Sequence, residues 1–199
     1  MSGSVRGTSS NRRSYRDEPI TNSNRKMNRE YQVLFIICLV CHIFRSFYEI
    51  LKYKNIVSPS NKFVFTLVFI NMSLLWASWF MMCEVDPVKL TIPFPLRFTG
   101  LLLFIAGILL FAYTLIKLRT LDDYQGNLVQ DGLFSITRHP MYLGFIFWLV
   151  GYSVFQQSKY TLITSTIWIL NVLFWRYIEE KQLEIKYSEF KEYKRKTIF

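Results

Sequence analysis

Long apolar runs alternate with short charged segments along most of the chain. Residues 63–83 and 98–116 contain no charged side chain, and each is long enough to cross the roughly 30 Å hydrocarbon core of a bilayer as a helix. Residues 31–51 form a more polar run that includes Arg45 and Glu49, whose spacing of four allows them to pair on one helix face. The pattern predicts three transmembrane helices over these runs.

A longer apolar stretch follows, from Met141 to Trp175, and the polar residues Gln156–Lys159 interrupt it. The interruption predicts a helical hairpin, with helices over 141–155 and 160–175. Each helix is short for a full crossing, so the hairpin is expected to be tilted or partly buried in protein. The chain is thus predicted to be an all-α polytopic membrane protein with about five membrane segments and its termini on opposite sides.

The two ends of the chain are polar and differ in pattern. Residues 1–30 are rich in Ser, Asn and Arg without apolar periodicity, which predicts a disordered basic tail and not a cleavable signal peptide. Residues 31–199 are then expected to form a single membrane domain. Residues 177–194 are charged, yet four of them share one helical face, which predicts an amphipathic helix lying against the membrane: Glu180, Leu183, Tyr187 and Phe190.

Composition narrows the class of protein further. The chain has 199 residues, is 51% hydrophobic and 18% aromatic, and has a formal net charge of +10. Such apolarity excludes disorder throughout, and three cysteines exclude a disulfide-stapled secreted domain. No nucleic-acid partner is expected, because the basic residues flank the spans and the aromatic residues lie inside the apolar runs. Lys and Arg are more numerous on the side of the C-terminus, which predicts a cytosolic C-terminus.

One motif suggests a haem or metal site and is better interpreted as packing. Cys38-Leu-Val-Cys41-His42 matches the C-x-x-C-H pattern of covalent haem attachment, but it lies in the middle of a predicted membrane helix. No second axial ligand is apparent, and the third cysteine, Cys83, is far away in the sequence. We therefore expect two buried thiols, a histidine packed between helices, and no metal site.

The segment before the fourth apolar helix concentrates polar chemistry. Arg138 and His139 precede Pro140, which suits the first position of a helix. Helix N-termini present unpaired N–H groups and the positive end of the helix dipole, so the pattern indicates a site for an anion at the membrane surface. The alternative is a basic flank that anchors the helix at lipid headgroups, with Tyr142 in the interfacial aromatic belt.

A pair of acids, Glu179 and Glu180, follows the fifth apolar segment. Acids beside an apolar face are costly unless they have a partner, although an ordinary charged run on a cytosolic helix is the simpler alternative. The predicted topology brings the acids and the Arg138–His139 pair to the same membrane face. Cationic and anionic groups that open onto lipid would suit a zwitterionic ligand together with a lipophilic partner.

Two runs resemble motifs of the isoprenylcysteine carboxyl methyltransferases and their prokaryotic relatives, within a phospholipid methyltransferase-like superfamily of integral membrane enzymes. The first is Leu128-Val-x-x-Gly132-Leu-Phe134-x-x-x-Arg138-His139-Pro140-Met141-Tyr142-Leu-Gly144. The second is Glu179-Glu180-x-x-Leu183-x-x-x-Tyr187-Ser188-x-Phe190-x-x-Tyr193, in which Tyr187, Ser188 and Phe190 replace the family's Phe, Gly and Tyr. The resemblance covers residues 128–197.

The resemblance implies a methyltransferase that uses S-adenosylmethionine, with a cofactor pocket built from this loop, the hairpin and the C-terminal helix. Arg138 would hold the carboxylate of a lipophilic acceptor. A carboxylate acceptor is ionised at neutral pH, so the enzyme must mainly align the reactants and exclude water, without a catalytic metal. The resemblance assigns cofactor binding to six residues: His139, Pro140, Tyr142, Gly144, Glu179 and Glu180.

The acceptor stays open at this stage. Residues 117–127 are shorter than the corresponding segment of the family, and this departure bears on the acceptor more than on the cofactor. The resemblance favours an isoprenylcysteine-like carboxylate as the acceptor, with a phospholipid amine or a small thiol as alternatives. An NADPH-dependent lipid or sterol reductase would need a pocket for the 2′-phosphate, and residues 117–137 offer no extra basic pair. A non-catalytic scaffold would tolerate loss of Arg138 and Glu180. The membrane would be the plasma membrane in a prokaryote and the endoplasmic reticulum in a eukaryote, and the sequence leaves the oligomeric state open.

Overall fold

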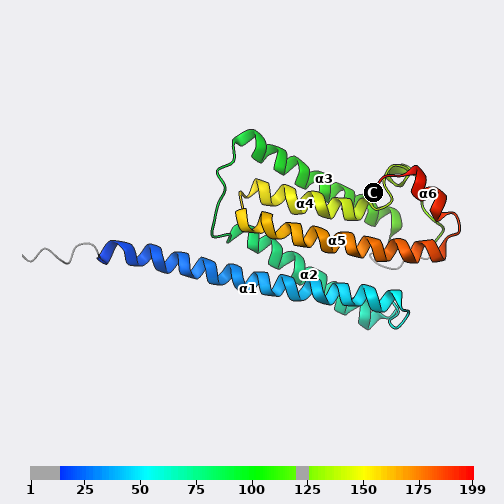
Figure 1. The fold of residues 1–199 in the computed structure, drawn as a ribbon, viewed down its shortest axis with the longest axis horizontal. Coiled ribbons are helices and arrows are strands. Elements are labelled where there is room, and N and C mark those ends of the chain that lie inside the picture. Colours follow the sequence, from blue (N-terminus) through cyan, green and yellow to red (C-terminus); the bar gives the residue numbers. More distant parts are fainter. Residues whose placement is uncertain (1–13, 120–125) are drawn as a thin grey trace, which may run out of the picture.

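The computed structural model describes residues 14–119 and 126–199, and helices dominate both ranges (Figure 1). The long helices lie side by side with their axes roughly aligned, and a short helix covers one end of the bundle. This arrangement confirms the predicted all-α class. The helices are α1 (Ser14–Tyr53), α2 (Lys62–Glu84), α3 (Phe94–Leu118), α4 (Pro140–Phe155), α5 (Lys159–Lys186) and α6 (Phe190–Lys196), with a short 3-10 helix, η1, at Gly132–Ser135.

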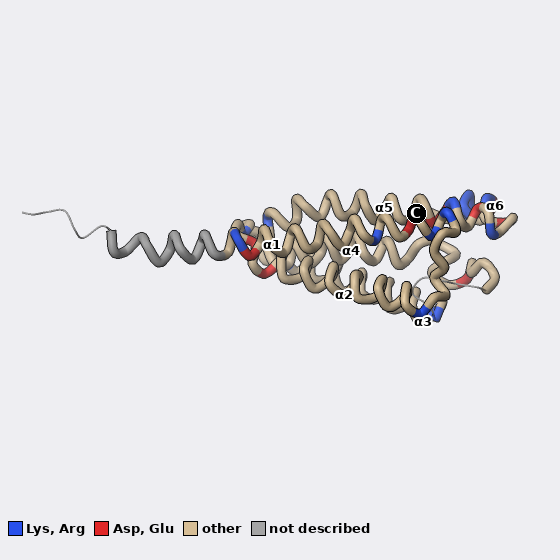
Figure 2. The backbone as a smooth tube through the Cα atoms, turned by 90° about the horizontal axis from the view of Figure 1, so that it is seen from below, with Lys and Arg blue, Asp and Glu red and all other residues tan. Residues whose placement is uncertain are grey.

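The helices have the length and composition of membrane spans. Within the described residues, four helices are long and apolar enough to cross a bilayer, namely Met27–Tyr53 within α1, together with α2, α3 and α5, whereas α4 is apolar but has only 16 residues. Charged residues gather near the two ends of the bundle (Figure 2), as expected when hydrocarbon surrounds its middle. About five membrane segments, including the short fourth one, therefore agree with the sequence-based expectation.

The beginning of α1 differs from the predicted disordered tail over residues 1–30. The helix starts at Ser14, so residues 14–30 are helical. Extending an existing helix is much easier than nucleating one, and the apolar run that follows supplies the established helix. The prediction for residues 1–13 lies outside the described residues.

The C-terminal boundaries also differ from those expected. α5 does not end near Trp175 but continues unbroken to Lys186. The chain then turns at Tyr187, which has an extended backbone, and α6 is a separate short helix. The single amphipathic helix predicted over 177–194 is therefore wrong. Residues 176–186 contain neither Gly nor Pro, so nothing in the sequence stops α5 where its apolar character fades.

α3 and α4 pack more closely than any side chain between them would allow. A Cβ atom on Gly144 would lie 2.6 Å from the Gly107 carbonyl oxygen, and one on Gly151 would lie 2.6 Å from the Gly100 oxygen. Small residues at such contacts allow membrane helices to approach through their backbones. This contact fixes the N-terminus of α4 relative to α3.

The C-x-x-C-H motif packs as predicted. The His42 ring stacks on Trp168, with centroids 4.3 Å apart, and lies 5.4 Å from the Trp175 ring. Cys38 and Cys41 are buried thiols in the same core. Among the described residues, no group of three or more His, Cys, Asp and Glu side chains is placed to hold a metal ion.

Candidate active site

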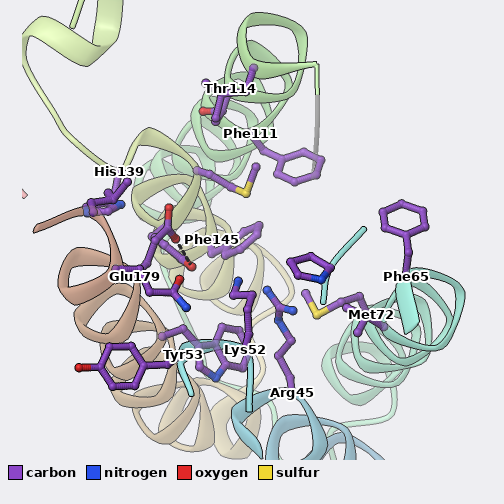
Figure 3. A pocket seen from close by; sticks show the side chains of 18 of the residues that line it. Arg45, Lys52, Tyr53, Phe65, Met72, Phe111, Thr114, His139, Phe145 and Glu179 are labelled. Carbon is purple, nitrogen blue, oxygen red and sulfur yellow. Dashed lines mark hydrogen bonds between the residues drawn. The ribbon is translucent and has the colours of Figure 1, made fainter. Parts of the chain in front are cut away.

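A cavity of about 950 Å³ opens at the end of the bundle where α1, α3 and α5 finish and where α2 and α4 begin (Figure 3). Its volume falls within the range of roughly 300–1,000 Å³ that is usual for small-molecule sites. The lining of the cavity is partly polar and partly apolar. The apolar part includes Met72, Trp76, Phe111, Phe145, Trp148 and Trp175.

The loop that leads into α4 is fixed by tyrosines from both sides. Gly132 has a φ of +61°, and a Cβ there would lie 2.2 Å from the Tyr113 hydroxyl oxygen, so only glycine fits. That hydroxyl accepts a hydrogen bond from the Leu133 N–H at 3.2 Å. On the other side, the Tyr193 hydroxyl of α6 donates to the Phe134 carbonyl at 2.5 Å. The loop therefore presents the next residues at a defined place, the start of α4.

Arg138 lines the cavity, but its hydrogen bonds lead to the C-terminal segment. Its Nη1 donates to the carbonyls of Lys194 (3.1 Å) and Thr197 (2.5 Å). Its backbone N–H donates to the Phe199 carbonyl at 3.0 Å. These contacts favour a role in fastening the loop to the C-terminal segment over the predicted role of holding an acceptor carboxylate.

Glu180 lies in the same buried cluster and not on the cavity wall. Its carboxylate is 2.6 Å from the Lys194 ammonium, 3.3 Å from Arg138 Nε and 3.4 Å from His139 Nε2. The ion pair raises the pKa of Lys194, because the carboxylate stabilises its charged form. The acid and the two residues before α4 do meet at one membrane face, as the topology predicts, but there Glu180 pairs with Arg138 and Lys194.

Glu179 has a different environment from its neighbour. Successive residues of a helix project about 100° apart, so when Glu180 faces the ionic cluster, Glu179 faces the cavity. Its Oε2 accepts a hydrogen bond of 2.6 Å from the Tyr142 hydroxyl of α4, drawn as a dashed line in Figure 3. The cavity thus has one acid on its α5 wall, held in place by a buried tyrosine.

A comparison with models of protein families found a match that covers most of the helices that line the cavity. Residues 96–189 match the model of the phospholipid methyltransferase family. These residues are therefore similar to a family of membrane methyltransferases, and they are called the methyltransferase domain below. The comparison with curated proteins found no match, and neither did the comparison with solved structures. The methyltransferase domain contains η1, α4, α5 and most of α3, and with them Glu179 and Tyr142.

The remaining residues predicted for the site divide between the cavity and the helix packing. His139 and Pro140 line the cavity, at the N-terminus of α4, and both are buried. Gly144 does not line it but faces Gly107 of α3. In this structure Gly144 positions α4 in the methyltransferase domain by permitting the close backbone contact.

One wall of the cavity comes from outside the methyltransferase domain and was not predicted as part of a site. Arg45 and Lys52 of α1 line it, and both pair with the fully buried Glu49, at 2.5 Å and 2.8 Å. The predicted Arg45–Glu49 pair is thereby confirmed. The available signal was the recurrence of charges at 45, 49 and 52, a helical spacing that puts all three on one face of an otherwise apolar run.

Proposed function

We propose that the protein transfers a methyl group from S-adenosylmethionine to a lipophilic acceptor at the membrane face, with an isoprenylcysteine-like carboxylate as the favoured acceptor. The observation that carries this proposal is the Glu179–Tyr142 pair, which places an acid in a largely apolar cavity of the methyltransferase domain. An acid in such surroundings calls for a cationic ligand, since an uncompensated charge is costly there.

The chemistry of the lining residues fits that cofactor. The Glu179 carboxylate complements an ammonium group, and His139 with the N-terminus of α4 suits a carboxylate. Trp76 and Trp148, whose ring centroids are 3.7 Å apart, offer faces for a sulfonium cation or for a planar base. The cofactor supplies an electrophilic methyl group on a sulfonium.

The residues of this chain need only bind, orient and exclude water. A carboxylate acceptor carries no proton at neutral pH, so no side chain has to remove one. Holding two reactants in line converts a bimolecular step into an effectively unimolecular one, which can contribute about 7–11 kcal/mol to lowering the barrier. The aromatic lining of the cavity would keep water away from the reacting atoms.

A phospholipid amine is the second candidate acceptor. The family match names phospholipid methyltransferases, and an amine must lose a proton before or during methyl transfer. Glu179, hydrogen-bonded to Tyr142 at the cavity wall, is a carboxylate that could receive it. The same family match favours methyl transfer over the reductase and the scaffold. The side of the membrane is likewise a proposal, namely that the cavity faces the cytosol together with the C-terminus.

A direct assay tests the proposed function. The purified full-length protein in lipid nanodiscs is incubated with methyl-labelled S-adenosylmethionine and one acceptor in each reaction. The acceptors are a farnesylcysteine analogue, phosphatidylethanolamine and a small thiol. The proposal expects label in the farnesylcysteine product. Label only in phosphatidylethanolamine would establish the second candidate, and absence of transfer to all three would contradict both.

A further inference from the structure

We propose that Arg45 and Lys52 of α1 bind the anionic headgroup of the lipid acceptor, either a carboxylate or a phosphodiester. The proposal rests on the proposed function, since it assigns the second substrate of the same cavity. It adds an anion subsite on a helix that lies outside the matched methyltransferase domain, which begins at residue 96.

The charged side chains of α1 lie at different depths from the cavity. Glu49 is fully buried, whereas Arg45 and Lys52, which flank it along α1, belong to the cavity lining. Figure 3 shows both cationic side chains extending from α1 toward the cavity. A ligand in the cavity therefore meets a guanidinium and an ammonium, while the acid that pairs with them lies behind. In a site with little water, such charges attract an anion more strongly than they would in bulk solvent.

The part of α1 that carries Arg45 is fastened to α5 by side-chain hydrogen bonds. The Trp175 indole N–H of α5 donates to the Ser46 hydroxyl at 2.9 Å, and this hydroxyl donates to Asn171 Oδ1 at 2.9 Å. These bonds fix the face of α1 next to Arg45 against the methyltransferase domain. A preorganised guanidinium loses little freedom when it binds a carboxylate or a phosphate in bidentate fashion.

The cavity as a whole offers both signs of charge. Figure 3 shows Glu179 of α5 and the two cations of α1 along the same cavity, on side chains from different helices, so the two helices attract groups of opposite charge. The cation-attracting wall suits the methyl donor, which leaves the α1 wall for the anionic end of the acceptor. Ser58 and Ser60 on the loop after α1 line the same side and offer hydroxyl donors for its oxygens.

An apolar surface at the cavity can accommodate the lipid tail. Phe65 and Phe69 of α2 line the cavity, and with 41% and 53% of their surface exposed they leave an apolar surface of α2 uncovered. In a membrane, that surface faces hydrocarbon. An acceptor whose headgroup lies at Arg45 and Lys52 can therefore run its acyl or prenyl chain along α2 into the bilayer.

Binding measurements on the full-length protein in detergent test the subsite without requiring turnover. The probes are N-acetyl-S-farnesylcysteine, its neutral methyl ester, a short-chain phosphatidylethanolamine and inorganic phosphate. We expect the wild type to bind the carboxylate about tenfold more tightly than the ester, the gain from one charge-assisted hydrogen bond. Lys52→Gln should lose about that factor for the anionic lipids only. Lys54→Gln, an exposed neighbour outside the cavity, is the matched control and should bind as the wild type does.

Both cations pair with the buried Glu49, so the thermal unfolding midpoint of Lys52→Gln is measured as well. Arg45 lies nearer to this acid, at 2.5 Å against 2.8 Å, and its removal is therefore balanced by neutralising the acid. Arg45→Gln combined with Glu49→Gln removes the pair together, and its thermal unfolding midpoint reports whether it folds. Lys52 remains in this variant, so we expect its preference for the carboxylate over the ester to be smaller than that of the wild type but not abolished.

Three outcomes would overturn the subsite. The wild type could bind the carboxylate no more tightly than the ester, both variants could bind the lipids as tightly as the wild type does, or inorganic phosphate could bind as tightly as the lipids. Failure of the proposed function would show in the transfer assay and not in the binding measurements. If the anionic lipids bind through Arg45 and Lys52 but receive no methyl group from S-adenosylmethionine, the subsite stands and methyl transfer to them does not. Conversely, methyl transfer with an unchanged KM for the acceptor in Lys52→Gln would support the function and reject the subsite.

Discussion

At the scale of single residues, Glu179 and Glu180 have different partners although they are adjacent in the sequence. Glu179 accepts a hydrogen bond from Tyr142 on the cavity wall, whereas Glu180 is buried among Arg138, His139 and Lys194. We infer that Glu179 binds a ligand and that Glu180 holds the loop before α4 to the C-terminal segment. Substitution of each acid separates the two roles.

Glu179→Gln should weaken binding of the demethylated cofactor product, S-adenosylhomocysteine, while the protein stays folded. Loss of one charged hydrogen bond is worth about 1.5–3 kcal/mol, which corresponds to roughly tenfold to a hundredfold in affinity. Isothermal titration calorimetry measures it, with Glu189→Gln, an exposed acid outside the cavity, as control. Equal affinities in both variants would refute this role of Glu179.

Glu180→Gln should instead lower stability. It leaves Arg138, whose side chain is only 9% exposed, without its carboxylate partner, and breaking a buried ion pair from one side costs about 3–5 kcal/mol. We expect a lower thermal unfolding midpoint, with cofactor-product affinity close to that of the wild type below that temperature. A variant with wild-type stability and no product binding would reverse the assignment of the two acids.

At the scale of elements, the contact between α3 and α4 sets where the site lies. Gly144 and Gly107 let the two backbones touch, and this contact places the N-terminus of α4, with His139 and Pro140, beside the cavity. A residue that the family resemblance assigns to the cofactor pocket thus acts through the packing of two helices.

Gly144→Leu should therefore destabilise the protein, because the new side chain meets backbone and cannot move it aside without separating the helices. Overpacking of this kind typically costs about 1–3 kcal/mol. The thermal unfolding midpoint should fall, whereas Thr99→Leu, which adds similar bulk on the exposed surface of α3, should leave it nearly unchanged. An unaltered midpoint in Gly144→Leu with lost cofactor binding would return Gly144 to the pocket.

Sequence analysis predicts the apolar spans well because the bilayer dictates their length and composition. It also finds the loop before α4 and the acids after the hairpin, whose residue types are unusual at a membrane face. Which residues of a helix face the interior depends on how the helix is rotated about its axis, and the packing of the helices decides that rotation. For that reason the sequence pattern does not reveal that Glu180 pairs with Arg138 and Lys194 or that the Arg45–Glu49 pair lies beside a cavity, and the predicted end of α5 is too early.

At the scale of the whole molecule, the cavity is a joint product of the methyltransferase domain and of α1 and α2. The ends of α1, α3 and α5 and the beginnings of α2 and α4 meet at one end of the bundle (Figure 1). Charged groups accumulate there, with α6 beside them (Figure 2). A site in this position is open both to a polar cofactor from the aqueous side and to a lipid from the bilayer.

The topology that this arrangement requires can be measured by cysteine labelling in sealed vesicles. Lys54→Cys and Lys191→Cys should react with a membrane-impermeant maleimide from the same side, and Thr91→Cys from the other. All three positions are exposed, whereas the native cysteines are buried, so the background should be low. Labelling of positions 54 and 191 from opposite sides would contradict five membrane segments.

The central claim, methyl transfer in a cavity organised by Glu179, is tested most directly by initial rates. Wild type, Glu179→Gln and Glu189→Gln are compared for transfer from labelled S-adenosylmethionine to a farnesylcysteine analogue, at a cofactor concentration below KM. The account predicts transfer by the wild type, an equal rate in Glu189→Gln, and a rate at least about tenfold lower in Glu179→Gln. A full rate in Glu179→Gln would contradict it.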